Sequence, residues 1–345
     1  MASIKGIAEQ VGVSKTTISN YLKNPATSHI REATKQRIRT IIEELNFRTN
    51  VIAQSLSTNK TNVVGIVIPY DGMIFESTLL DEFLSGIQRR LFKDDYSLLF
   101  LPSRGEDPIT RIRLQIRKGQ GYDGFVLFGT RYCTEEDMKL YINELRTTNI
   151  PFVVANMPDL GLPLNQVVLR DPPDAGAIKY LLDLGHRQIF LMAGRPGDAQ
   201  GGGEIIQYRS TLMKKGVEVD EQLIGYGDYE LDIARSELFI RISRGIQFTA
   251  IYCLTDMMAM GCYQALREAG LKIPEDVSVI GKNDAFFARS LQPTLTCIGR
   301  DLVRAGEIIA DILLQMVRNL GYSRKIFLDS ELIVRDSTRA ITSEL

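Results

Sequence analysis

Residues 4–22 read IKGIAEQVGVSKTTISNYL, and this stretch decides the fold of the N-terminal part of the chain. Its first half has apolar side chains at the i, i+3, i+4 and i+7 positions of an amphipathic helix, namely Ile4, Ile7, Ala8 and Val11. Gly12 ends this helix, and Ser14 is a good N-cap for a second helix over residues 15–22. Two short helices joined by a tight, glycine-containing turn predict a helix-turn-helix.

A third helix is expected to complete a small all-α domain over residues 1–48. Its apolar face combines Thr34, Ile38, Ile41, Ile42 and Leu45. The exposed positions of the second helix carry a cation and short polar groups, at Lys15, Thr16, Thr17, Ser19 and Asn20. Such groups suit the base edges and phosphates of a DNA major groove. The alternative is an ordinary polar helix face.

The distribution of charge favours the DNA-binding interpretation. Residues 1–61 contain nine Lys or Arg and four acidic residues, a net charge of +5. The rest of the chain contains 32 basic and 38 acidic residues, a net charge of −6. A basic head on an acidic body is typical of a DNA-binding module joined to a domain with another task.

Several other classes of protein are not expected. No apolar run is long enough to span a membrane, and the first residues lack the apolar core of a secretion signal, so we expect a cytoplasmic location. The four cysteines contain no CxxC pair, which favours reduced thiols over a zinc site. No catalytic or metal-binding spacing appears, so we predict no enzyme, no cofactor and no metal.

Residues 49–61 are interpreted as a hinge. Asn50 can cap a short helix over residues 51–57, and a polar linker over residues 58–62 follows. An isolated helix of this length is marginal in water, so we expect it to fold only on DNA.

Residues 62–345 alternate between β-branched strands and helical patterns. The predicted strands are 63–68, 97–101, 124–128, 152–155, 167–169, 189–192, 250–253 and 277–280. The predicted helices between them include 79–92, 135–147, 175–184 and 257–269. This alternation predicts an α/β core of parallel sheets in two lobes, with a ligand site outside the carboxyl ends of the strands.

The chain resembles the lactose/galactose repressor family over its whole length. The resemblance is carried by residues 4–22 and 41–47, and in the core by residues 184–187, 276–281 and 292–296. It implies a helix-turn-helix head and a two-lobed core like that of periplasmic sugar-binding proteins. The family's three crossings between lobes imply lobe one at about 62–160 and 290–320. Lobe two is then expected at about 161–289 and 321–345.

The resemblance also implies a role for the hinge. In the family this helix enters the minor groove and inserts a Leu between base pairs, and Leu56 matches that Leu. Gln54 stands where the family usually has Arg, and the Pro that usually precedes Asn50 is Thr49. The alternative is a linker helix that packs on its own head.

Effector-binding positions follow from the same resemblance. Those that match strand ends of the family are Tyr70, Asp71, Phe75, Thr130, Arg131 and Asp171. Those where this chain departs from the usual residues are Glu204, Thr255, Asp256, Asn283 and Asp284. Residues 194–203 are glycine-rich, lack the Lys and Ser/Thr of a phosphate-binding loop, and are interpreted as a flexible loop at the cleft edge.

Glu204 replaces an Arg that clamps the ligand in the family, which reverses a charge. A free carboxylate would repel anions, so we hypothesise that the effector is not a sugar phosphate or a purine-like anion. Two alternatives are that Glu204 faces solvent in a remodelled loop and that the cleft no longer binds a ligand.

The sequence therefore predicts a transcriptional regulator. It is expected to bind a palindromic double-stranded operator as a homodimer, with a small-molecule effector, a carbohydrate, controlling its DNA affinity. The rival classes are a ligand-binding receptor without a DNA-binding role and an α/β enzyme.

Overall fold

The computed structural model describes residues 3–23, 30–45, 47, 60–69, 77–102, 110, 113, 121–130, 133–171, 176–197, 199–318 and 323–341. The chain divides into two compact units, Met1–Thr61 and Asn62–Leu345. Among the described residues, no helix is both long enough and apolar enough to cross a membrane.

The first unit holds three short helices, α1 (Ile4–Val11), α2 (Lys15–Lys23) and α3 (Glu32–Glu44). Ser3 caps α1 by accepting a hydrogen bond from the Gly6 amide, and Gly12 ends it with φ = 77°, a left-handed conformation that glycine adopts without strain. The small core contains Ile7, Ala8, Val11, Ile18, Tyr21 and Ile38. The predicted helix-turn-helix and its third helix are confirmed.

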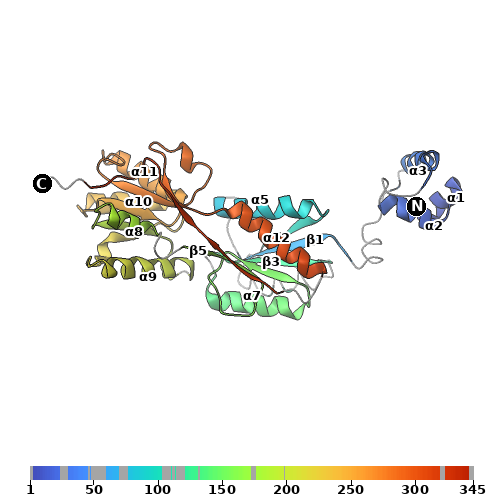
Figure 1. The fold of residues 1–345 in the computed structure, drawn as a ribbon, viewed down its shortest axis with the longest axis horizontal. Coiled ribbons are helices and arrows are strands. Elements are labelled where there is room, and N and C mark those ends of the chain that lie inside the picture. The colour runs from blue at the N-terminus through green and yellow to red at the C-terminus, as the bar shows by residue number, and fades with distance from the viewer. Residues whose placement is uncertain are drawn as a thin grey trace. The chain divides into compact units, whose positions relative to one another are not determined.

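Lobe one of the second unit is a six-stranded sheet in the order β11-β5-β4-β3-β1-β2. The strands are β1 (Val63–Ile68), β2 (Ser97–Pro102), β3 (Gly124–Phe128), β4 (Phe152–Ala155), β5 (Gln166–Arg170) and β11 (Lys325–Asp329). All the pairings are parallel. Helices α5 (Thr78–Phe92) and α12 (Leu302–Arg318) cover one face, and α7 (Glu135–Thr147) covers the other (Figure 1).

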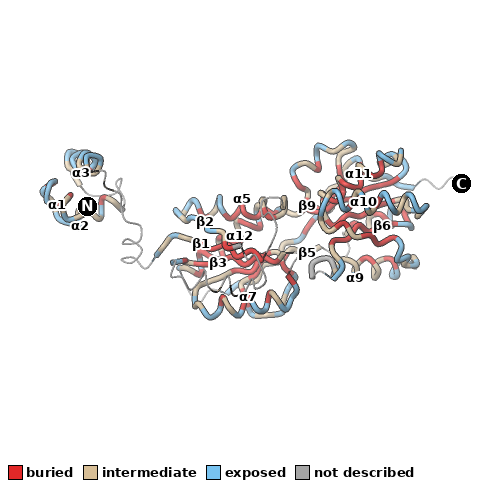
Figure 2. The backbone as a smooth tube through the Cα atoms, turned by 180° about the vertical axis from the view of Figure 1, so that it is seen from behind, coloured by how far each residue is buried: buried red, intermediate tan, exposed pale blue. Residues whose placement is uncertain are grey.

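Lobe two is a second six-stranded sheet in the order β12-β10-β9-β8-β6-β7. Its strands are β6 (Ile189–Ala193), β7 (Ile224–Tyr226), β8 (Ala250–Cys253), β9 (Ser278–Asn283), β10 (Thr296–Gly299) and β12 (Glu331–Ile333). Its helices are α8 (Ala177–Asp183), α9 (Ala199–Lys214), α10 (Leu231–Ser243) and α11 (Asp256–Glu268). Figure 2 shows the buried residues concentrated on the strands of each lobe and the exposed residues on the outer sides of the helices.

The chain crosses between the lobes three times, but the lobe ranges expected from the sequence are wrong by about ten residues at each crossing. β5 and β11 pair with each other in lobe one, although both were assigned to lobe two. β10 pairs with β9 in lobe two, although it was assigned to lobe one. The crossings fall at Asp171, at Arg300 and at Ser330, because each strand completes its own sheet before the chain changes lobe.

The interpretation of the glycine-rich residues 194–203 as a loop is also wrong in part. α9 begins at Ala199, so the last five residues of the segment interpreted as a loop are helical. Helix α9 lies on lobe two with α8, and Tyr208 anchors it by donating a hydrogen bond to the Ile189 carbonyl at 2.8 Å. Packing of that buried ring outweighs the low helix propensity of the three glycines.

Candidate functional site

The outer side of α2 carries the predicted DNA-reading residues. Lys15, Thr16 and Asn20 are exposed, while Thr17 and Ser19 are half-buried. Ser14 caps the helix by accepting a hydrogen bond from the Thr17 amide at 3.1 Å. The hydroxyls of Ser14 and Thr17 also bond to each other at 2.8 Å, which gives Thr17 a local partner. The cap and the buried ring of Tyr21 hold one side of α2 to the head, so its polar side faces water.

Seven of the predicted positions lie outside the described residues. They are Asn50, Gln54 and Leu56 in the hinge, and Tyr70, Asp71, Phe75 and Arg131 in the core.

Asp171 lies at the first crossing, directly after β5, and forms the centre of an ion cluster. Lys282 on β9 places its Nζ 2.5 Å from Oδ2 of Asp171. Arg300 at the second crossing donates to Oδ1 at 2.9 Å, and the Ser330 hydroxyl at the third crossing donates to the same oxygen. Burial alone would raise the pKa of Asp171, but the Lys282 and Arg300 charges outweigh it and hold that pKa well below its usual range.

Glu204 on α9 joins this cluster, because its carboxylate forms an ion pair with Lys282. The premise that Glu204 is a free carboxylate is therefore wrong, and so is the alternative that it faces solvent in a loop. Two carboxylates and two cations meet here, so the cluster is neutral and gives no reason to exclude anionic effectors.

A second group of carboxyls lies at the carboxyl end of β9. Asp284 pairs with Arg335 at 2.7 Å. Burial raises the pKa of Glu82 on α5 to about 7, and the nearby charge of Asp284 adds to the effect. Glu82 belongs to lobe one and Asp284 to lobe two, so the two lobes approach each other at this point as well.

Asp256, at the start of α11, is 1% exposed. It accepts hydrogen bonds from the Ala285 amide at 2.7 Å and from the Cys297 thiol at 3.2 Å. Burial raises its pKa to about 7, although these two hydrogen bonds oppose part of the shift. Both oxygens already have partners within lobe two, and an effector role for Asp256 stays a prediction.

The remaining predicted positions lie at strand or helix ends. Thr255 caps α11 by accepting a hydrogen bond from the Met258 amide at 3.2 Å. Thr130 donates to the Pro69 carbonyl at 2.5 Å. Asn283 has φ = 102°, a left-handed conformation that short polar side chains tolerate better than most. Its buried Oδ1 has no hydrogen-bond partner in the part of the chain that the structure describes.

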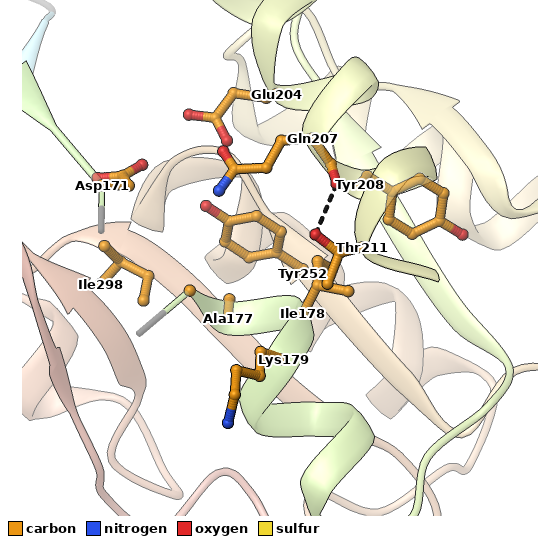
Figure 3. A pocket seen from close by; sticks show the side chains of 11 residues that line it. Asp171, Ala177, Ile178, Lys179, Glu204, Gln207, Tyr208, Thr211, Tyr252 and Ile298 are labelled. Carbon is orange, nitrogen blue, oxygen red and sulfur yellow. Dashed lines mark hydrogen bonds between the residues drawn. The ribbon is translucent and has the colours of Figure 1, made fainter. Parts of the chain in front are cut away.

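A narrow pocket adjoins the ion cluster. Asp171, Glu204 and Gln207, together with the hydroxyl end of Tyr252, face one common space (Figure 3). The cavity volume is about 20 Å³, which is room for about one water molecule. Beside Asp171 and Glu204, this pocket therefore has no room for a small-molecule effector unless a side chain moves.

The sequence analysis predicted that Asp171 and Glu204 lie in the same cleft, but it did not predict the cations that pair with them, Lys282 and Arg300. β9 (sequence SVIGKN) is buried at all six positions and extends past the predicted strand end at Ile280 to include Lys282. A Lys directly after the apolar run Val279–Gly281 is the signal that could have revealed it. Arg300 directly follows β10 and Ser330 directly follows β11. The sequence analysis did not predict these two strands, so it could not place the two residues at crossings between the lobes.

Comparison with known proteins agrees with this architecture. Residues 3–50 match the family described as bacterial regulatory proteins, lacI family. Residues 178–338 match a periplasmic binding protein-like domain. Among curated relatives, the HTH-type transcriptional repressor PurR of Vibrio atlanticus (strain LGP32) is 27% identical and covers 99% of this chain and 100% of its own.

Two solved structures share the fold. One is the lac repressor dimer bound to operator and the anti-inducer ONPF, with a TM-score of 0.84 and 22% identity over 98% of this chain and 99% of its own. The other is the transcriptional regulator CelR–cellobiose complex, with a TM-score of 0.69 and 23% identity over 98% of this chain and 100% of its own.

A helix-turn-helix head joined to a two-lobed, periplasmic-binding-protein-like core defines a class of DNA-binding regulators. The chain combines a helix-turn-helix domain that matches the lacI family with a periplasmic-binding-protein-like core, and the curated relatives that it matches over its whole length are transcriptional repressors.

Proposed function

We propose that the protein binds a palindromic operator as a homodimer and that a small carbohydrate, bound between the lobes of the core, controls its affinity for DNA. It would act in the cytoplasm, where bacterial operators lie. The observation that carries the proposal is the exposed polar side of α2, which presents Lys15, Thr16 and Asn20 from a helix that Ser14 caps. In helix-turn-helix proteins the second helix reads the major groove, and a dimer reads two half-sites.

Two further observations support the proposal. The lac repressor structure, whose fold this chain shares, contains a dimer, an operator and a small molecule, and the CelR structure contains a disaccharide. The core of this chain brings Asp171 and Glu204 to one cleft through different elements. Ligand binding that changes the angle between lobes can alter the hinge segments and thereby DNA affinity.

The test is fluorescence-anisotropy binding of the full chain to a palindrome library with a randomised core. We expect selective, salt-sensitive binding, and we expect Leu56→Ala to weaken it by about tenfold or more, which corresponds to about 1.4 kcal/mol. Ser55→Ala, a change in the same segment that removes no apolar wedge, is the matched control. Sedimentation of the complex should give two chains per operator.

Three results would contradict the proposal. They are the absence of selective binding with and without a carbohydrate panel, a stoichiometry of one chain per operator, and equal loss of affinity in Leu56→Ala and Ser55→Ala.

A further inference from the structure

The three crossings between the lobes are tied together at one carboxylate. Asp171 at the first crossing receives donors from Arg300 at the second and Ser330 at the third. Lys282 adds a donor from β9. Four groups from four places in the sequence therefore fix one another, and Asp171 holds the ammonium of Lys282 in a defined position.

Lys282 is an unusually buried cation. Its side chain is 4% exposed, and a buried ammonium needs anionic partners to offset the loss of water. β9 aligns Lys282 with Ile298 on the neighbouring strand, and both belong to the face of the sheet that lies under α9. From that helix, Glu204 supplies the second anionic partner.

Glu204 is the more weakly held of the two carboxylates. Its side chain is 18% exposed, against 10% for Asp171. Lys282 is its one ion-pair partner among the described residues, whereas Asp171 has three donors. Movement of Glu204 into water would therefore cost less than movement of Asp171, since it breaks one interaction of a partly hydrated group.

The site also has an unused donor. The Nε of Arg300 is buried and has no acceptor within the part of the chain that the structure describes. The same guanidinium donates from Nη2 to Asp171, which also binds the ammonium of Lys282. Lys282 is 4% exposed and paired with Glu204, and the cavity beside Asp171 and Glu204 holds about one water, so a ligand group would reach Lys282 from this side by displacing the Glu204 carboxylate.

We propose that Lys282 is an anion-binding centre of the effector cleft, and that Glu204 occupies it when no effector is bound. The effector then carries an anionic oxygen group, a carboxylate or a phosphate, that takes the place of Glu204. This inference rests on the proposed function of the cleft. Displacement of Glu204 into water keeps the cluster neutral, and an anion with several oxygens can also accept from Arg300. A neutral sugar would leave the Lys282–Glu204 pair intact.

Chemical rescue of the full chain tests the proposal. Glu204→Ala removes the internal carboxylate and leaves a space beside Lys282. We expect sodium acetate to raise the Tm of this variant by about 2 °C or more relative to sodium chloride of equal concentration. A parallel titration with inorganic phosphate distinguishes the two anion classes. Wild type, whose site is filled by Glu204, should show no difference between the salts.

Two variants show whether the effect belongs to this site. Glu204→Ala/Lys282→Met should lose the acetate-dependent rise, because the cation is gone. Asp159→Ala is the matched control, since it removes the carboxylate from an exposed pair with Lys325 in lobe one. An equal rise in either variant, or no rise with either anion in Glu204→Ala, would overturn the proposal.

A second substitution guards against a folding defect. Glu204→Gln fills the same volume without charge, so it should fold, and acetate should stabilise it less than it stabilises Glu204→Ala. Equal stabilisation of the two variants would also contradict an anion bound in the place of Glu204. These measurements need no DNA, so failure of operator binding and failure of the anion site are separate results.

Discussion

Lys282 determines the charge that an effector meets in the cleft. The comparison of single positions with the family pointed to a reversal of charge at Glu204 on α9, but the structure places the cation of Lys282, from β9, beside it. A position-by-position resemblance cannot reveal such an exchange, because the two residues are 78 positions apart and meet only through packing of α9 on the second sheet. The ends of predicted strands did locate Asp171, since carboxyl ends of parallel strands share one edge.

The stability of the protein should depend on pH through Asp256. Its pKa is about 7 in the folded chain and 3.8 in an unfolded one, so the folded state binds more protons between these values. The free energy of unfolding contributed by this group is therefore highest below pH 4 and falls as the pH rises towards 7. Asn at position 256 cannot titrate. The free energy of unfolding of Asp256→Asn, measured by urea denaturation, should therefore rise relative to that of wild type from pH 5 to pH 8.

A matched control for this change is Asp183→Asn, on the surface of lobe two. Ion pairing with Lys179 lowers the pKa of Asp183, so this group stays charged across the same range. Its difference from wild type should not vary between pH 5 and pH 8. If Asp256→Asn behaved like Asp183→Asn, the Asp256 carboxyl would not be protonated in the folded chain at pH 5.

At the scale of elements, α5 and α12 meet through two glycines. A Cβ atom on Gly306 would lie 2.2 Å from the Phe83 carbonyl oxygen, and one on Gly86 would lie 2.0 Å from the Val303 carbonyl oxygen. The helix backbones are thus in direct contact, which fixes α12, the element that follows the second crossing, against lobe one.

Gly306→Ala should destabilise the protein by about 1–3 kcal/mol, because the added methyl group can be accommodated only if the two helices separate. Gly202→Ala in α9 is the control: a Cβ there meets nothing within 4 Å, so alanine should stabilise the helix by up to about 1 kcal/mol. Urea denaturation measures both. Equal effects of the two substitutions would show that the close approach is not required.

The sequence predicted elements unevenly along the chain. Strands with continuous apolar runs, such as β1 and β3, were predicted with their bounds correct or within a residue. The short edge strand β7 and the strands after Leu295 were missed. β7 and β12 have only three residues each, and the apolar run of β11 is only three residues long between Lys325 and Asp329. Two of the missed strands, β10 and β11, directly precede the second and third crossings, so those lobe bounds were wrong although the two-lobed fold was right. The first crossing was also misplaced, although the strand before it, β5, was predicted.

At the scale of the whole molecule, the charges are divided between the two units. The first 61 residues carry a net charge of +5 and the remainder −6, so the chain as a whole is nearly neutral. Attraction to DNA phosphates is then confined to the head, and the acidic core opposes binding through other surfaces.

Operator affinity should therefore fall with salt according to the cations of the head. Lys15→Ala should reduce the slope of log K against log salt by about one, if Lys15 contacts a phosphate. Lys215→Ala, which removes an exposed cation from the core, should leave the slope unchanged. The measurement is anisotropy at several salt concentrations, and a larger change for Lys215→Ala would place the phosphate contacts elsewhere.

The third crossing has a consequence for synthesis on the ribosome. Ser330 is the single residue between β11 and β12, which add the edge strands to two different sheets. The head can fold as soon as it emerges, but neither lobe receives its last strand until the region around Ser330 has been translated. At 5–20 residues per second, residues 62–345 take about 15–60 s to make. During that interval a folded head is tethered to two unfinished lobes, and both are completed almost simultaneously.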